Sequence, residues 1–237
     1  MKKLLFFLSF LITLHYFSQK TEKLALRKYK IATLSDSLKE TSGLTFLKDK
    51  LYTLNDGGNT NEIFEIDKNS GKILSKLKIN FPNKDWEAMT SDGENFYIGD
   101  FGNNAGNRKD LAIYKTDFQG NYSKNSFNYS AQDDFSTRYL SHNYDAEAMI
   151  FRNEKIHVFS KEWSSKNISH YIVELQNSEN QSLVSLESFH AGFVITDAAY
   201  FQGKLYVVGY TRKAKVYMMI FQENSEGLFF SKPLKKY

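Results

Sequence analysis

Short apolar segments alternate with polar turns along most of this chain, and the pattern recurs four times. Each unit begins with a small apolar run, passes through a turn into an aromatic or β-branched run, and ends in two further runs. Short runs of this kind bounded by Gly, Asn and Asp predict β-strands. The predicted strands lie at 42–46, 49–56, 62–67 and 72–79; within 85–104, then 111–115 and near 127–130; at 147–151, 155–159, 171–175 and 183–189; and at 197–201, 204–208, 216–220 and 228–231.

The spacing of the units indicates the architecture. Equivalent positions in the second strand of each unit are 45, 60 and 49 residues apart, at Tyr52, Tyr97, His157 and Tyr206. Four-stranded units of this length are typical of propeller blades. The longer interval contains the polar region 121–143, which we predict to be a long loop. The prediction is an all-β protein, a β-propeller of four-stranded blades with four blades visible; the alternative is an irregular sandwich of about sixteen strands.

The two ends of the repeat region complicate the closure of the ring. A strand-like segment, 24–34, precedes the first unit, and propellers commonly use such a strand to complete the last blade. The fourth unit already has an outer segment of its own, 228–231. Either four blades close with an extra edge strand, or the chain is part of a five- or six-bladed ring and is incomplete at its C-terminus. We favour the larger ring, because an open one would leave an exposed sheet edge.

Residues 1–19 have the features of a signal peptide. Lys2 and Lys3 precede a nearly continuous apolar run, 4–17, which is about 14 residues long where a membrane span needs roughly 20. The absence of cysteine excludes a lipid-modified cysteine and any disulfide. We therefore expect a secreted or periplasmic protein, with 20–237 as a single domain and no stable membrane insertion after cleavage. An uncleaved N-terminal anchor is the alternative.

Composition adds little to this assignment. The chain has 20 phenylalanines and 15 tyrosines but only two prolines, which agrees with a β-rich fold. The net charge of +4 comes from scattered lysines, so no nucleic-acid partner is predicted. The chain has neither a serine-hydrolase elbow nor a phosphate-binding loop, and its histidines lack metal-site spacing.

Acidic residues recur at matching positions of the units. Glu87 and Glu147 begin two of the predicted inner strands, and Asp85 and Asp145 stand two residues before them. Further polar residues follow the second strands: Asn55, Asp56, Asp100, Asn104 and Lys161. Inner strands line the channel of a propeller, so carboxylate and amide oxygens would converge there as calcium requires. Asp and Asn at strand ends also commonly cap turns. For the two glutamates a functional role is favoured, because burying Glu without a partner is costly.

Five stretches carry a resemblance to a known family: 42–44, 54–59, 85–88, 99–104 and 145–149. They resemble a little-characterised family of secreted β-propellers of the Bacteroidetes type. They are more distantly similar to six-bladed calcium-dependent propellers that include lactonases, strictosidine-synthase-like proteins and phytase-like esterases. The resemblance covers about 40–210 and implies a channel site where Glu87, Glu147, Asp100 and Asn104 help to hold calcium. Family members continue beyond the point where this chain ends and carry another acidic motif, which puts ring closure and a complete site in question.

The functional prediction is a central-channel site that uses calcium to hydrolyse an ester, lactone or phosphoester. In this hypothesis Asp85 or Asp145 is the general base, while calcium bound by acidic residues polarises the substrate. Asn55, Asp56 and Lys161 are predicted to contact the small-molecule or glycan ligand. The alternative is a non-catalytic scaffold that binds a glycan or an envelope protein, because the fold alone does not decide between these functions.

Overall fold

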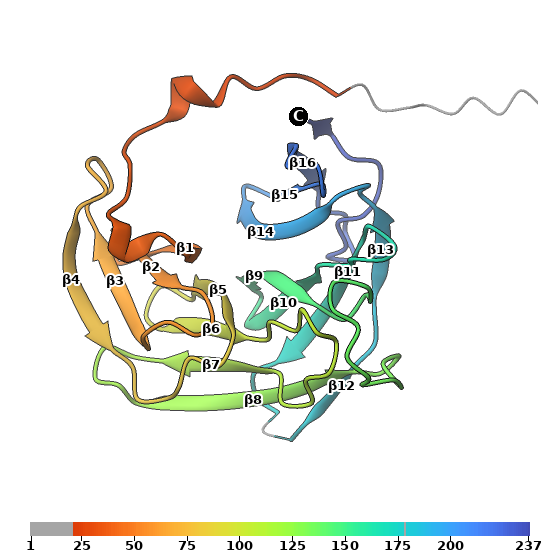
Figure 1. Ribbon diagram of the computed structural model, residues 1–237, viewed down its shortest axis with the longest axis horizontal. Coiled ribbons are helices and arrows are strands. Elements are labelled where there is room, and N and C mark those ends of the chain that lie inside the picture. Colours follow the sequence, from red (N-terminus) through yellow and green to blue (C-terminus); the bar gives the residue numbers. More distant parts are fainter. Residues whose placement is uncertain (1–20, 178) are drawn as a thin grey trace, which may run out of the picture.

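The protein is an all-β propeller of four blades, as the repeats predict (Figure 1). The computed structural model describes residues 21–177 and 179–237, so the predicted signal peptide, 1–19, lies outside the described residues. Four antiparallel sheets follow one another around a common centre in chain order. A ring with more than four blades stays a prediction. None of the helices among the described residues has the length and apolar character needed to cross a membrane.

Each sheet contains a four-stranded antiparallel meander, and sheet 3 passes from β11 to β13 because the intervening β12 joins sheet 2. Sheet 1 contains β1 (Thr41–Leu47), β2 (Lys50–Asn55), β3 (Glu62–Ile66) and β4 (Ile73–Lys78); sheet 2 contains β5 (Trp86–Ser91), β6 (Phe96–Asp100), β7 (Ala112–Thr116) and β8 (Tyr122–Tyr129); sheet 3 contains β9 (Ala146–Arg152), β10 (Lys155–Ser160), β11 (Asn167–Glu174) and β13 (Glu187–His190); sheet 4 contains β14 (Val194–Phe201), β15 (Lys204–Tyr210), β16 (Val216–Gln222) and β17 (Lys235–Lys236). The innermost strands are β1, β5, β9 and β14, and neighbours pack against each other from β1 to β14.

Aromatic side chains fill the interfaces between sheets, which explains why Phe and Tyr are so frequent. Tyr52 of sheet 1 meets Phe96 of sheet 2 edge-on, with ring centres 4.9 Å apart. Tyr97 of sheet 2 stacks on Phe151 of sheet 3 at 5.3 Å. Phe229 is fully buried in the core cluster between sheets 3 and 4. Burial of each such ring contributes roughly 1.5–3 kcal/mol, so the sheets are held together face to face.

The segment before β1 links sheet 4 to sheet 1, and Figure 1 shows it running outside the ring between them. The Glu22 amide donates to the Lys236 carbonyl at 2.9 Å, and Leu38 packs against Phe64 at the other end. The prediction of a strand at 24–34 is wrong. The segment contains a short 3-10 helix, η1 (Leu26–Tyr29), and a second one, η2 (Asp36–Leu38), follows it. At its start the segment pairs with β17, through the parallel bridge of Thr21 to Lys236, and it then leaves that edge to cross to sheet 1.

The outer strands also depart from prediction. Residues 228–231 form no strand, because the Phe229 and Phe230 amides donate to the Glu187 carboxylate at 2.8 and 2.6 Å. The two-residue β17 is the outer strand of sheet 4 instead.

Two further predictions about sheets 2 and 3 need correction. The region 183–189 is divided: β12 (Gln181–Leu183) joins β8 of sheet 2 in parallel, and β13 completes sheet 3. The predicted loop 121–143 begins later than expected, because most of its first nine residues form β8.

Candidate functional site

Each innermost strand carries one β-bulge, and the four bulges face the same pocket. In the strand registers, Gly43, Glu87, Glu147 and Thr196 are the residues left without a partner. A bulge inserts one residue into a strand and redirects its side chain. All four residues line a pocket of about 420 Å³ at the centre of the ring. The predicted convergence of first-strand residues from different blades is therefore confirmed.

Three carboxylates come together at this pocket. Asp56 directly follows β2, Asp85 directly precedes β5, and Glu87 occupies the β5 bulge. One oxygen of each lies within 4.8 Å of the others. Glu87 is only 2% exposed. Of the three, only Glu87 was predicted as a metal ligand; Asp85 was predicted as a base and Asp56 as a ligand contact.

Two glycines allow the backbone to approach these carboxylates closely. A Cβ on Gly102 would lie 2.5 Å from both Asp85 Oδ2 and Glu87 Oε1. A Cβ on Gly57 would lie 2.8 Å from the Cα of Asp85. Such distances are well inside van der Waals contact, so a larger residue at either position requires the acidic side chains to move. The glycines of the Asp-Gly-Gly and Gly-Asp-Phe-Gly motifs are thus part of the wall of the site.

The three carboxylates repel one another in a water-poor setting. Burial, together with the nearby Asp56 and Asp145, raises the pKa of Glu87 to about 9. Burial also raises the pKa of Asp85 to about 6, against the opposing effect of Arg108. Burial likewise raises the pKa of Asp56. Bringing acidic groups together at this energetic cost favours the binding of a cation.

The donor atoms suit a hard cation such as calcium, which takes oxygen ligands. Besides the three carboxylates, the neighbouring Asn55 has a buried side-chain oxygen with no hydrogen-bond partner among the described residues. Its amide nitrogen is used, donating to the Ser37 carbonyl at 2.9 Å. Asn55 precedes Asp56 in the chain but is not among the residues that line the pocket, so its predicted ligand contact stays a prediction.

The other side of the pocket holds a buried cation. Lys161 is 3% exposed and pairs with Glu147. Its ammonium lies 4.7 Å from the ring centre of Trp163 and 5.8 Å from that of Tyr210. Burial lowers the pKa of Lys161, while Asp145 and Glu87 oppose this effect. Glu147 therefore has its own counter-charge, whereas Glu87 faces two other carboxylates.

The remaining predicted site residues are tied into the surrounding structure. Asp145 accepts hydrogen bonds from the Asn103 amide at 2.8 Å, the Ala146 amide at 3.0 Å and the Trp163 indole at 2.9 Å. Asp100 accepts from Arg108 at 2.8 Å. Asp100 and Asn104 are not among the residues that line the pocket. The metal roles of Asp100, Asn104 and Glu147, and the role of Asp145 as base, stay predictions.

Sequence reasoning missed two residues with a clear place in the site. Arg108 donates to the Gly102 carbonyl at 2.9 Å and lies 3.9 Å from Asp85 Oδ2, so it supports the outer side of the acidic group. Asp197 lines the pocket, and burial raises its pKa to about 6. In the strand registers Asp197 takes the position of Ala88 and Ala148, one residue after the bulge, so the repeat gave no signal for an acidic residue there. Arg108 lies in an irregular loop, where no pattern pointed to it.

Comparison with known proteins gives a fold likeness only. No family model matches the chain, and no curated protein matches it. Among solved structures it is similar to a putative 6-phosphogluconolactonase from Bacteroides fragilis (14% identity, TM-score 0.43), with 83% of this chain and 56% of that one covered. It is similar to an α-L-arabinofuranosidase from Clostridium thermocellum (12% identity, TM-score 0.48; 81% and 71% covered). It is also similar to the β-propeller domain of Cps50 from Myceliophteria thermophila (10% identity, TM-score 0.46; 83% and 58% covered). The chain thus spans under three-fifths of the length of two of these three.

Proposed function

We propose that the protein is a calcium-dependent hydrolase whose central pocket binds the ion on Asp56, Asp85 and Glu87 and cleaves an ester, lactone or phosphoester. The observation that carries the proposal is the approach of these three carboxylates to within 4.8 Å of one another at a pocket lined by all four blades. The proposal keeps the secreted or periplasmic location expected from residues 1–19. Calcium sites of extracellular modules have dissociation constants of about 10⁻⁴–10⁻³ M, which is the range expected here.

Calcium, when bound, would supply a Lewis acid that polarises a substrate oxygen. The chain supplies the remaining groups. Lys161 is held among Glu147, Trp163 and Tyr210 behind the pocket lining, where its charge neutralises Glu147 and so limits repulsion of an anionic substrate.

The pocket carboxylate best suited to accept a proton from water is Asp197. Asp85 belongs to the acidic group, and both oxygens of Asp145 accept hydrogen bonds. One oxygen of Asp197 accepts from the Ala198 amide at 2.8 Å, and the other has no hydrogen-bond partner among the described residues. A carboxylate with a pKa of about 6 is mostly ionised at neutral pH, as a general base must be.

The test is hydrolysis of model substrates with added calcium and with chelator. Suitable substrates are p-nitrophenyl acetate, p-nitrophenyl phosphate and a δ-lactone. We expect calcium-dependent turnover of one class that Glu87→Gln and Asp56→Asn each lower at least about a hundredfold, consistent with loss of a metal ligand. Asp197→Asn should lower turnover without weakening calcium binding.

Asp133→Asn is the matched control, because it removes the same charge from an exposed aspartate outside the pocket. It should leave turnover unchanged. Calcium binding without hydrolysis of any class would support a metal-stabilised binding scaffold and overturn the enzyme proposal. Turnover that persists in chelator would overturn the metal dependence.

A further inference from the structure

Sheet 4 has two apolar faces, but only one of them packs against a neighbouring sheet. On β15 and β16, Leu205, Val207 and Phe221 are buried in the cluster shared with sheet 3. Val208 alternates with these residues and so faces the other way, as does Val216, which is 66% exposed. An apolar sheet face left in contact with water is unfavourable and marks a surface for a ligand or partner.

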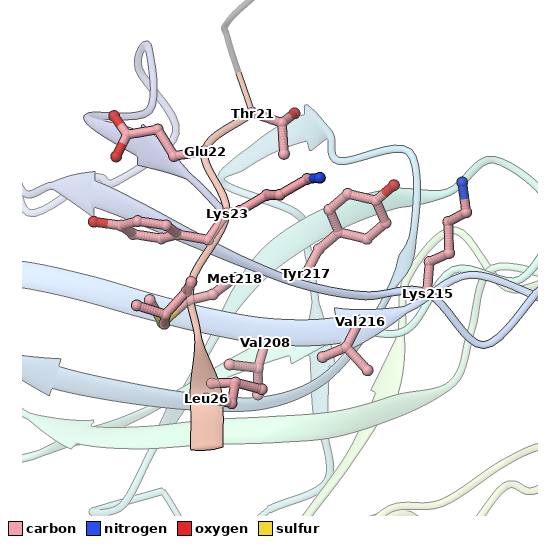
Figure 2. Close-up of a pocket in the computed structure, with 11 residues that line it drawn as sticks. Thr21, Glu22, Lys23, Leu26, Val208, Lys215, Val216, Tyr217 and Met218 are labelled. Atoms are coloured by element: carbon pink, nitrogen blue, oxygen red, sulfur yellow. The ribbon is translucent and has the colours of Figure 1, made fainter. Parts of the chain in front are cut away.

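The N-terminal segment crosses this second face and encloses a pocket of about 550 Å³ (Figure 2). Val208, Val216 and Met218 from β15 and β16 form its floor, and Leu24 and Leu26 line it from the crossing segment. Leu26 is 61% exposed although it lies over the pocket. This volume lies within the range of small-molecule sites, which are mostly apolar with a few polar groups.

The rim of this pocket carries positive charge. Lys23 and Lys215 both line it, and Figure 2 shows their ammonium groups above the side chains of Val208 and Val216 in this view. Within the part of the chain that the structure describes, neither lysine has a carboxylate at ion-pair distance. The one acidic residue of the lining, Glu22, lies 3.6 Å from Lys235 and is thereby compensated. An aliphatic floor beneath two unpaired ammonium groups is complementary to an amphipathic anion.

We propose that this pocket binds a free long-chain carboxylate, with its alkyl chain on the Val208–Met218 floor and its head group between Lys23 and Lys215. Every methylene buried on the floor adds to the affinity, which makes chain length the main determinant of binding. The positive charge of the two rim lysines favours a ligand whose head group is negatively charged. The site is separate from the central pocket, with which it shares no lining residue, so it does not depend on the proposed hydrolase activity.

Calorimetric titration with decanoate below its micelle concentration tests the proposal. We expect one decanoate per protein, bound at least about tenfold more tightly than decyltrimethylammonium, which has the same chain and the opposite charge. Lys215→Glu should weaken decanoate binding at least about tenfold, and Val216→Asp should do the same by placing a carboxylate on the floor. Both positions are on the surface, so the fold should be retained.

Two control variants match these changes. Val184→Asp changes a valine of nearly the same exposure, 67%, outside the pocket, and Lys78→Glu makes the same charge reversal on β4. Both should bind decanoate as the unmodified protein does. Equal affinity for the two detergents, or equal weakening by test and control variants, would overturn the proposal. A concentration-dependent dimer that Val216→Asp abolishes would assign the face to a second copy of the chain instead.

Discussion

Glu87 and Glu147 are the bulged residues of the neighbouring inner strands β5 and β9, and both line the central pocket, but their charges are balanced differently. Both begin the same tripeptide, Glu-Ala-Met. Glu147 pairs with Lys161, whereas Glu87 lies against Asp56 and Asp85. The same Glu-Ala-Met motif thus contributes an ion-paired glutamate on one side of the pocket and a member of the three-carboxylate group on the other. The acidic group is where a cation would bind.

Removal of the buried ammonium should destabilise the protein strongly. Lys161→Met leaves Glu147 and the other pocket carboxylates without their counter-charge, and breaking a buried pair in this way costs about 3–5 kcal/mol. Adding Glu147→Gln removes the unpaired charge and should restore most of the lost free energy of unfolding. Denaturant unfolding of the two single variants and the double variant measures this coupling. A double variant no more stable than Lys161→Met would show that the pair is not the cause.

Because Gly102 lies against the acidic group, we expect a larger residue at this position to abolish calcium binding, whereas a substitution at Gly58 should not. Gly102→Ala places a Cβ 2.5 Å from oxygens of Asp85 and Glu87, so these side chains must separate. We expect the calcium-induced rise in melting temperature to disappear. In Gly58→Ala the Cβ enters open space, although its φ of 79° strains an alanine. That variant should lose about 1 kcal/mol of stability and keep the calcium response. The reverse pattern would contradict the role given to Gly102.

Asp197 should make stability fall as pH rises. Burial places its folded pKa at about 6, above the unfolded value of 3.8, so the folded protein holds a proton that the unfolded chain has lost. The free energy of unfolding that this bound proton contributes is fully present below pH 3.8 and is lost as pH rises to 6. Because solvent reaches part of this group, we expect Asp197→Asn to raise stability above pH 6 by about 1–2 kcal/mol and to change little below pH 4. Urea midpoints at pH 4 and pH 7.5 measure the difference. A constant effect at both pH values would exclude ionisation as its cause.

His157 should have the opposite pH dependence. Burial, with His170 next to it, lowers its folded pKa to about 4, below the unfolded value of 6.5. Arg152 and Glu223 also face it, with opposing effects. Between these values the unfolded chain binds the extra proton, so stability is lost as pH falls from 6.5 to 4, by up to about 3 kcal/mol.

The variant that tests this is His157→Asn, which keeps a polar group but cannot be protonated. It should flatten the pH dependence of the urea midpoint between pH 7 and pH 4.5. His190 is an exposed histidine on the same sheet, so His190→Asn should leave the pH dependence of the urea midpoint unchanged. Equal slopes in the two variants would show that His157 is not responsible.

The four-blade arrangement was predictable because the first three strands of each unit are buried or half-buried and therefore carry regular patterns. The outer strands carry weaker patterns: β4 is mostly exposed, and β8 alternates only over its last five residues. At 228–231 the apolar residues resemble a strand, yet Phe229 is buried between sheets and the backbone donors go to Glu187. Nothing local distinguishes that outcome from strand pairing.

The site was predictable only in part, for a related reason. The spacing of the repeats identified Glu87 and Glu147 and their convergence. The spacing did not show that Asp56 lies close to Glu87 or that Lys161 forms an ion pair with Glu147. Those contacts depend on how the loops cross between blades. Arg108 lies in such a loop and reaches Asp100, eight residues away in sequence, by hydrogen bonding at 2.8 Å.

The most direct test of the central claim is thermal unfolding with 10 mM calcium and with chelator, for the unmodified protein and for Glu87→Gln. A ligand that binds only the folded state raises the midpoint by mass action. With a dissociation constant of about 0.1–1 mM, the expected rise is about 3–8 °C in the unmodified protein and none in Glu87→Gln. An unmodified protein that ignores calcium, or a Glu87→Gln variant that responds equally, would contradict a metal site on Asp56, Asp85 and Glu87.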